Sequence, residues 1–181
     1  MIDTQTIWIL VHVLFLVYWL GGDISVFYIA NQIKNQKNTE TRLALVKIIN
    51  FVNWFPNISN VFIFPVGLML LGGLGYFTLN SYLIFLIWSP FILWFFILCG
   101  SLTQRGNALG KIYYLIDNLI RLSLIFTIFI IVSILYYYDL IFIEGWVLLK
   151  LYLYGYILIC GIGIRTSFSQ FPSIIKALII E

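Results

Sequence analysis

Charged residues are scarce in this sequence. Asp, Glu, Lys and Arg make up 9% of the 181 residues, whereas hydrophobic residues make up 62%. A soluble globular domain carries roughly 25% charged residues, because its surface has to face water. The shortage excludes a soluble protein with an apolar core. We expect instead a single integral membrane domain over residues 1–181, an all-α polytopic bundle surrounded by the lipid bilayer, with no nucleic acid as a partner.

The residues of common catalytic and metal-binding motifs are also scarce. The chain has one histidine, His12, and two cysteines, Cys99 and Cys160, which lie in apolar runs. We expect the cysteines to be small core residues rather than a disulfide or a metal pair. CxxC, CxxCH, HExxH, a phosphate loop and a nucleophile triad are all missing. Gly161 and Gly163 lack the strand and helix of a dinucleotide fingerprint, so they indicate helix packing.

Long apolar runs are what the sequence has in abundance. A helix of about 20 apolar residues is needed to cross a bilayer, and five runs reach this length. A shorter stretch at about 40–53, with Asn38 or Thr39 as its cap, predicts an amphipathic cytoplasmic helix that leads into the second span. That span contains Pro65, which neighbouring helices make tolerable. The five spans are expected at about residues 7–30, 57–77, 82–102, 119–138 and 146–164.

The loops between these spans differ sharply in charge. If loops alternate between the two sides, one side holds nine of the ten basic residues and the other holds Asp3, Asp139 and Glu144. The positive-inside rule makes the basic side cytoplasmic. We therefore expect a multi-pass protein of the bacterial inner (cytoplasmic) membrane, with its N-terminus outside and its C-terminus cytoplasmic. The nine residues are Lys34, Lys37, Arg42, Lys47, Arg105, Lys111, Arg121, Arg165 and Lys176.

Two nitrogen-bearing side chains lie inside the spans, where ionisable residues are rare. His12 in the first span and Lys150 in the last are each about 6 Å below the start of their helix, so we expect them at one depth. His12 is either a structural histidine or a functional one. A functional histidine would be an axial haem ligand or a group that handles protons. Lys150 is either a second ligand or a side chain that snorkels to the interface. Alternatively, the second ligand could be the His12 of another copy of the chain in a homodimer.

Acidic residues near the spans are expected in ion pairs. Asp23 lies three helical turns after His12 and shares its face, but it is too far along the helix to orient the imidazole. Asp117 and Arg121 are spaced i, i+4, which predicts a structural ion pair. Asp23 is expected to pair with a basic residue near the cytoplasmic rim, and its candidate partners are Arg42, Arg121 and Arg165.

Three segments resemble the HemJ-type membrane protoporphyrinogen oxidases. In HVLFLVYWLGG, Trp19 follows His12 by seven residues and Gly22 follows it by ten, which is similar to the first helix of that family. WVLLKLYLYGYIL resembles the family's W-x-x-x-K helix, and NVFIFPVGLMLLGGLGYF resembles its proline-bearing second helix. The helical plan is also similar to that of copper-resistance D-type membrane proteins, and the WLGGD run to proteobacterial membrane proteins of about this length.

The resemblance implies a haem b site. His12 would be the metal ligand and Lys150 would lie beside it, with Trp19, Gly22 and Trp146 in the same cofactor-binding set. The chain departs from the family in having five spans rather than four. It also has Asp-Ile-Ser after the glycine pair, where the family has an aromatic-Leu-Pro-Arg run. The missing arginine argues against porphyrinogen oxidation more strongly than against haem binding.

Two functions from different classes follow from these observations. The first is a haem b or porphyrin-binding inner-membrane protein, in electron transfer or tetrapyrrole oxidation, with His12 as axial ligand. The second is a non-catalytic accessory subunit that packs against a larger respiratory or photosynthetic membrane complex through its glycine-lined second span. A transporter is less favoured, because the chain has no matched half-repeats. A Soret band would distinguish the first function from the second.

Overall fold

Helices make up nearly all of the computed structural model, which describes residues 3–104, 107–138 and 145–169. Within these ranges the chain is all-α and has no strand. Five stretches, with α2 and α3 taken together as one, are long and apolar enough to cross a membrane. These features define a multi-pass helical membrane protein. The helices are α1 (Thr4–Asn35), α2 (Thr39–Val52), α3 (Trp54–Gly73), α4 (Ser81–Thr103), α5 (Ala108–Tyr137) and α6 (Gly145–Ser169).

The chain divides into two compact units, Met1–Tyr113 and Tyr114–Glu181. The first unit contains α1 to α4 and the first turns of α5, and the second contains the rest of α5 together with α6. The expectation of one membrane domain stays a prediction. Four residues used in the charge argument lie outside the described ranges: Arg105, Asp139, Glu144 and Lys176.

The buried face of α1 is a narrow stripe. Trp19, Val26 and Ile33 are its buried residues, at intervals of seven, and His12 precedes Trp19 by another seven. A spacing of seven keeps side chains on one side of a helix, so the stripe faces the side on which α2 and α3 pack. Most of the other large apolar side chains of α1 are exposed, as suits a helix in contact with lipid.

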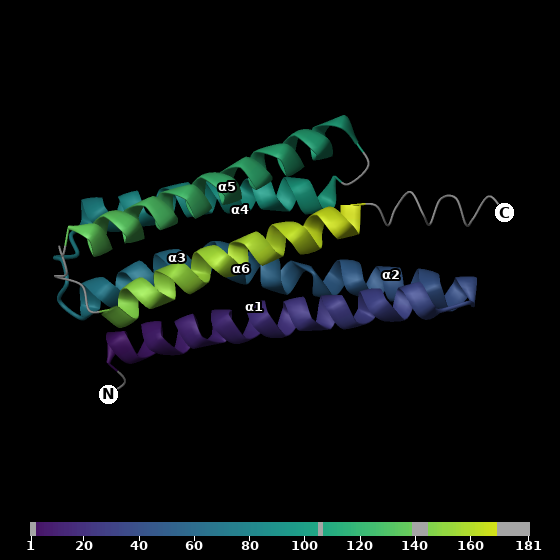
Figure 1. Cartoon of the computed structure of the whole chain (residues 1–181), viewed down its shortest axis with the longest axis horizontal. Coiled ribbons are helices and arrows are strands. Elements are labelled where there is room, and N and C mark those ends of the chain that lie inside the picture. Colours follow the sequence, from purple (N-terminus) through teal and green to yellow (C-terminus); the bar gives the residue numbers. More distant parts are fainter. Residues whose placement is uncertain (1–2, 105–106, 139–144, 170–181) are drawn as a thin grey trace. The chain divides into compact units, whose positions relative to one another are not determined.

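α2 and α3 lie end to end beside α1, which runs in the opposite direction (Figure 1). Only Asn53 separates the two helices. Asn38 caps α2, because its side-chain oxygen accepts hydrogen bonds from the backbone N–H groups of Glu40 at 2.9 Å and Thr41 at 3.3 Å. The amphipathic helix expected at 40–53 therefore corresponds to α2, and α2 leads directly into α3.

α3 ends at Gly73, before the end expected for this span at residue 77. Gly75 has a φ of 87°, a left-handed conformation that glycine adopts without steric penalty. The backbone N–H groups of Gly75 and Tyr76 donate to the carbonyls of Gly72 and Leu71. This pair of hydrogen bonds is a Schellman motif, which stops a helix. The glycine-rich segment thus terminates α3 as well as allowing close packing.

In the second unit, α5 and α6 pack antiparallel. Asp117, near the start of α5, forms an ion pair with Arg165, near the end of α6. Further along, the rings of Phe129 and Tyr152 meet edge to face with centroids 5.0 Å apart. A Cβ on Gly155 would lie 3.2 Å from Cε2 of Phe129. The absence of a side chain at this position lets the two helices approach closely.

Candidate functional site

His12 lies where α1 packs against α3. A Cβ built on Gly67 of α3 would lie 3.3 Å from Cε1 of His12 and 3.7 Å from its Nδ1. The imidazole therefore rests directly on the α3 backbone, and its Nδ1 atom is buried. Glycine at position 67 leaves the space that the ring needs, because a side chain there would push the ring away.

Aromatic rings flank His12 along the contact between α1 and α3, which we call the α1–α3 seam; the contact between α5 and α6 is the α5–α6 seam. Trp8 and Phe15 lie about one turn before and after His12 on the same face of α1. The Trp8 ring lies 6.0 Å from Trp88 of α4, and Phe15 stacks at 6.1 Å on Phe62 of α3. The Phe62 ring in turn lies 6.3 Å from Trp88 and 5.3 Å from Phe95. We call these five residues the aromatic cluster: Trp8, Phe15, Phe62, Trp88 and Phe95.

Trp19 and Gly22, the other residues singled out in the HVLFLVYWLGG segment, lie further along the packed face of α1. Trp19 is buried, with 2% of its surface exposed. A Cβ on Gly22 would lie 2.6 Å from Cδ of Pro56, so Gly22 allows close contact between α1 and α3. Asp23 is half-buried and lies roughly 16 Å along the helix axis from His12. Trp19 and Gly22 therefore hold the helix pair together on one side of His12.

Lys150 interacts with Trp146, one turn earlier on α6. Its Nζ atom lies 4.5 Å from the centroid of the indole ring, within the range of a cation–π interaction. Both side chains are exposed. This contact gives the W-x-x-x-K spacing a physical reason, and both interpretations of Lys150, as a second ligand and as a side chain that snorkels to the interface, stay predictions. His12 belongs to the first unit and Lys150 to the second, so a pocket shared by both stays a prediction.

Three charged side chains meet between α5 and α6. Asp117 is fully buried, and its Oδ1 lies 3.3 Å from Nε of Arg121, which is 1% exposed. Its Oδ2 accepts a hydrogen bond from Nη1 of Arg165, whose guanidinium lies over the ring of Tyr114 at 5.2 Å. Because a buried charge is costly unless it is paired, this carboxylate ties α5 to α6. We call Asp117, Arg121 and Arg165 the charge cluster.

Arg42 lies outside the charge cluster, on α2, where it contacts the end of α1. Its Nε donates a hydrogen bond of 3.1 Å to the carbonyl of Ile33, in the last turns of α1. A cation is stabilised there, because the carbonyls at a helix C-terminus carry partial negative charge. Arg42 thus links the end of α1 to α2. The pairing expected for Asp23, with Arg42, Arg121 or Arg165, stays a prediction.

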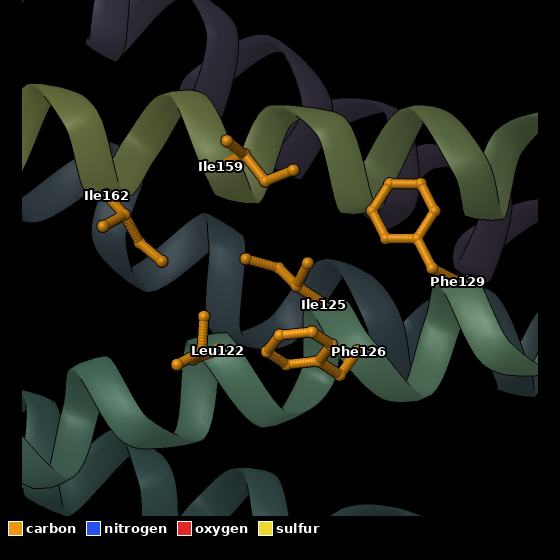
Figure 2. Close-up of a pocket in the computed structure, with 6 residues that line it drawn as sticks. All are labelled: Leu122, Ile125, Phe126, Phe129, Ile159 and Ile162. Carbon is orange, nitrogen blue, oxygen red and sulfur yellow. The ribbon is translucent and has the colours of Figure 1, made fainter.

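A groove of about 540 Å³ lies between α5 and α6. Figure 2 shows side chains from both helices around it, and all of them are apolar. Neither His12 nor Lys150 belongs to its lining. We call it the apolar groove, and its residues are Leu122, Ile125, Phe126, Phe129, Ile159 and Ile162.

The donor set around His12 limits how the protein can hold a metal. In the described part of the chain, no three His, Cys, Asp or Glu side chains gather in a way that could bind a metal ion. A haem needs only one or two ligands from the protein, because the porphyrin nitrogens supply the others. An imidazole nitrogen is a common ligand of haem iron. The imidazole itself fills the space at Gly67, and the rings of the aromatic cluster lie beside it along the same helix contact.

Sequence reasoning missed two features of these sites. Gly67 was one of several glycines in the second span, and only the packing of α1 on α3 shows that it contacts His12. The pairing of Arg165 with Asp117 joins residues 48 positions apart. A signal for this pair exists in the sequence, since Asp117 and Arg165 both lie at the same expected end of their spans.

Comparison with family models, with curated proteins and with solved structures finds no match for this chain. The class of the protein therefore rests on its own structure, which is an all-α multi-pass membrane protein in the described ranges. Its two candidate sites are the imidazole at Gly67 and the charge cluster with the neighbouring groove. The likeness to HemJ-type proteins stays a prediction.

Proposed function

We propose that this chain is a haem b-binding membrane protein with His12 as the axial ligand, acting in electron transfer or tetrapyrrole oxidation. One observation carries the proposal. The imidazole of the only histidine lies in a helix seam against Gly67, between aromatic rings of α1. Helical bundles hold haem through histidines placed in this way on inward helix faces.

The residues around His12 have separate tasks in this proposal. His12 supplies the imidazole nitrogen that binds iron, and the buried Nδ1 side of its ring is held against α3. The aromatic cluster gives flat apolar walls, which exclude water from the site. Haem, when bound, supplies one-electron chemistry, and an apolar environment is one of the means by which a protein sets its potential.

Location and orientation are part of the proposal. We place the protein in the bacterial inner membrane with its N-terminus outside. The support is the distribution of basic residues among the described helix ends: Lys34 at the end of α1, Lys111 at the start of α5 and Arg165 near the end of α6. These three ends lie on one side if the spans alternate, and that side is cytoplasmic by the positive-inside rule.

A second candidate is a non-catalytic subunit of a larger membrane complex, or of a homodimer. One observation favours it: a Cβ on Gly161 or Gly163 of α6 would meet nothing within 4 Å. Small residues on an open helix face allow another helix to approach closely. In this candidate His12 is a structural residue and the protein is colourless.

The experiment is an absorption spectrum of the protein purified in mild detergent from haem-replete cells. We expect a Soret band in the wild type and in Val11→Ala, a control at the adjacent half-buried position, and its loss in His12→Ala. Adding imidazole to His12→Gly should restore the band, which separates loss of the ligand from loss of the fold. Lys150→Ala tests the second ligand, because only a ligand would alter the band. A colourless wild type would overturn the proposal in favour of the second candidate.

A further inference from the structure

Within the first unit, the α1–α2 hairpin extends past the end of α4. The ring of Phe91 on α4 stacks on that of Phe64 on α3, with centroids 5.5 Å apart. Counting along the two helices from this contact places Thr103, the last residue of α4, level with the junction between α2 and α3. The 14 residues of α2 therefore lie beyond the end of α4, over roughly 20 Å, and the last turns of α1 run beside them (Figure 1).

Both helices of this hairpin expose large apolar side chains near its base. Phe27 and Tyr28 of α1 are 69% and 63% exposed. Ile48 and Phe51 of α2 are 50% and 67% exposed. All four lie within roughly 10 Å of the level at which α4 ends. We call these four residues the apolar collar: Phe27, Tyr28, Ile48 and Phe51.

The same hairpin is basic. Residues 24–52 carry one acidic residue, Glu40, and four basic ones, which are Lys34, Lys37, Arg42 and Lys47. The three lysines are exposed, whereas Arg42 is half-buried and bonded to the backbone of α1. In the part of the chain that the structure describes, the three lysines form no ion pair. Clusters of four or more basic residues beside a membrane helix are typical of segments that bind anionic headgroups.

The lysines differ in their distance from the membrane. A headgroup layer adds roughly 5–7 Å on each side of the hydrocarbon core. If the hydrocarbon ends where the apolar α4 ends, the apolar collar reaches into this layer. Lys47 lies roughly 9 Å beyond the same level, and a lysine side chain can bend back far enough to meet a phosphate. Lys34 and Lys37 lie at the tip, roughly 15 Å or more beyond it, where salt screens the attraction.

We infer that the base of the α1–α2 hairpin binds anionic phospholipid headgroups, with a lipid phosphate on Lys47 and the apolar collar among the glycerol groups and upper acyl chains. A lipid layer surrounds the hairpin, so it covers the exposed residues of both helices, and its phosphates match the surplus positive charge. A soluble acidic partner would instead meet the tip, at Lys34 and Lys37. The inference goes beyond haem binding, because it involves neither His12 nor its neighbours.

The first test is lipid selection by the purified protein. The protein in mild detergent is mixed with equal amounts of phosphatidylglycerol and phosphatidylcholine that have identical acyl chains, and the bound lipids are counted by native mass spectrometry. We expect phosphatidylglycerol to be enriched on the wild type and the enrichment to fall about fivefold in Lys47→Gln, which is the share of one basic residue near a lipid surface. Lys37→Gln is the matched control. It removes the same charge from the tip, and its loss should be less than about twofold.

The second test measures the depth of the apolar collar. Phe51→Cys and Lys37→Cys each carry a nitroxide spin label, in a chain whose two cysteines, Cys99 and Cys160, are replaced by serine. Both proteins are reconstituted into vesicles of phosphatidylglycerol and phosphatidylcholine. We expect the label at position 51 to be accessible to oxygen and protected from a water-soluble nickel complex. The label at position 37 should show the reverse. All the substituted lysines are exposed, so the fold should survive in each variant.

Four results would overturn the inference. The first is equal enrichment in the wild type and Lys47→Gln. The second is a loss in Lys37→Gln as large as that in Lys47→Gln, which would mean diffuse attraction or a site at the tip. The third is equal access of the nickel complex to both labels, which would make the apolar collar a surface for a soluble partner. The fourth is displacement of phosphatidylglycerol by millimolar inorganic phosphate, which would mean a site for a free anion. Failure of the haem proposal would leave all of these measurements unaffected.

Discussion

The α1–α3 seam and the α5–α6 seam solve the same packing problem with different chemistry. Each is an antiparallel helix pair that uses glycine for close approach, at Gly22 in the first and Gly155 in the second. The first presents one imidazole among aromatic rings, whereas the second buries a carboxylate between two guanidinium groups. An imidazole can bind a metal, whereas a buried ion pair ties two helices together. The polar group that a seam buries therefore determines what the seam can do.

Removing the carboxylate from the charge cluster should cause the largest loss of stability. Asp117→Asn leaves Arg121 and Arg165 facing each other in a buried position, and breaking a buried pair in this way costs about 3–5 kcal/mol of unfolding free energy. Unfolding of the detergent-solubilised protein, followed by circular dichroism, measures the loss. Asp3→Asn is the matched control, because Asp3 is exposed and makes no side-chain capping bond. Similar stabilities for the two variants would contradict the structural role of the cluster.

A substitution that prevents the close approach of α1 and α3 should have the second-largest effect on stability. Gly22→Ala places a Cβ 2.6 Å from Cδ of Pro56, and since a proline ring cannot turn away, we expect a loss of about 1–3 kcal/mol. The adjacent Gly21→Ala is the control, because its Cβ would meet nothing within 4 Å. Alanine is the better helix former by about 1 kcal/mol, so the control should be neutral or slightly stabilised. Equal melting temperatures would show that α1 does not pack on α3 in this register.

The corresponding glycine-to-alanine substitution between α5 and α6 should cause a smaller loss of stability. Gly155→Ala brings a Cβ to 3.2 Å from Cε2 of Phe129, and this ring can shift by a few tenths of an ångström. The expected loss is at most about 1 kcal/mol, partly offset by the helix propensity of alanine. Gly161→Ala, whose Cβ would be in open space, is the control in the same thermal melts. A loss larger than that of Gly22→Ala would reverse the ranking of the two seams.

The smallest effect on stability is expected at Gly67, where the readout is spectroscopic. Gly67→Ala puts a Cβ 3.3 Å from Cε1 of His12, so the imidazole must move slightly. We expect stability within about 0.5 kcal/mol of the wild type, together with a shifted Soret band or redox midpoint. Gly73→Ala is the control, because its nearest contact at 3.9 Å is ordinary packing. A wild-type spectrum in Gly67→Ala would place the haem away from this ring.

The fold class was predictable because it depends on local properties of the chain. Apolar runs of membrane-spanning length predict helices, and the structure has five stretches that meet this criterion. Helix ends were less predictable. α3 stops at a Schellman motif that depends on the φ of Gly75, while α5 begins at Ala108, well before the apolar run expected from residue 119. A helix can continue past the hydrocarbon layer, so hydropathy marks the membrane rather than the helix end.

The candidate sites were predictable only in part, since each joins a local signal to a distant residue. His12 was conspicuous as the one histidine in an apolar span, and the i, i+4 spacing indicated Asp117 with Arg121. The partners Gly67 and Arg165 lie on other helices, and their contacts follow from the register of helix packing. Sequence periodicity gives the face of a helix, but it does not give that register.

The measurement that tests the central claim most directly is the haem-to-chain ratio of the wild type, His12→Ala and Arg165→Gln, purified in parallel. We predict haem in the wild type and in Arg165→Gln, and none in a folded His12→Ala. A ratio near one would mean that each chain binds its own haem, and a ratio near one half would mean two copies of His12 on a shared iron. A wild type without haem, or a folded His12→Ala with wild-type haem content, would contradict the assignment of His12.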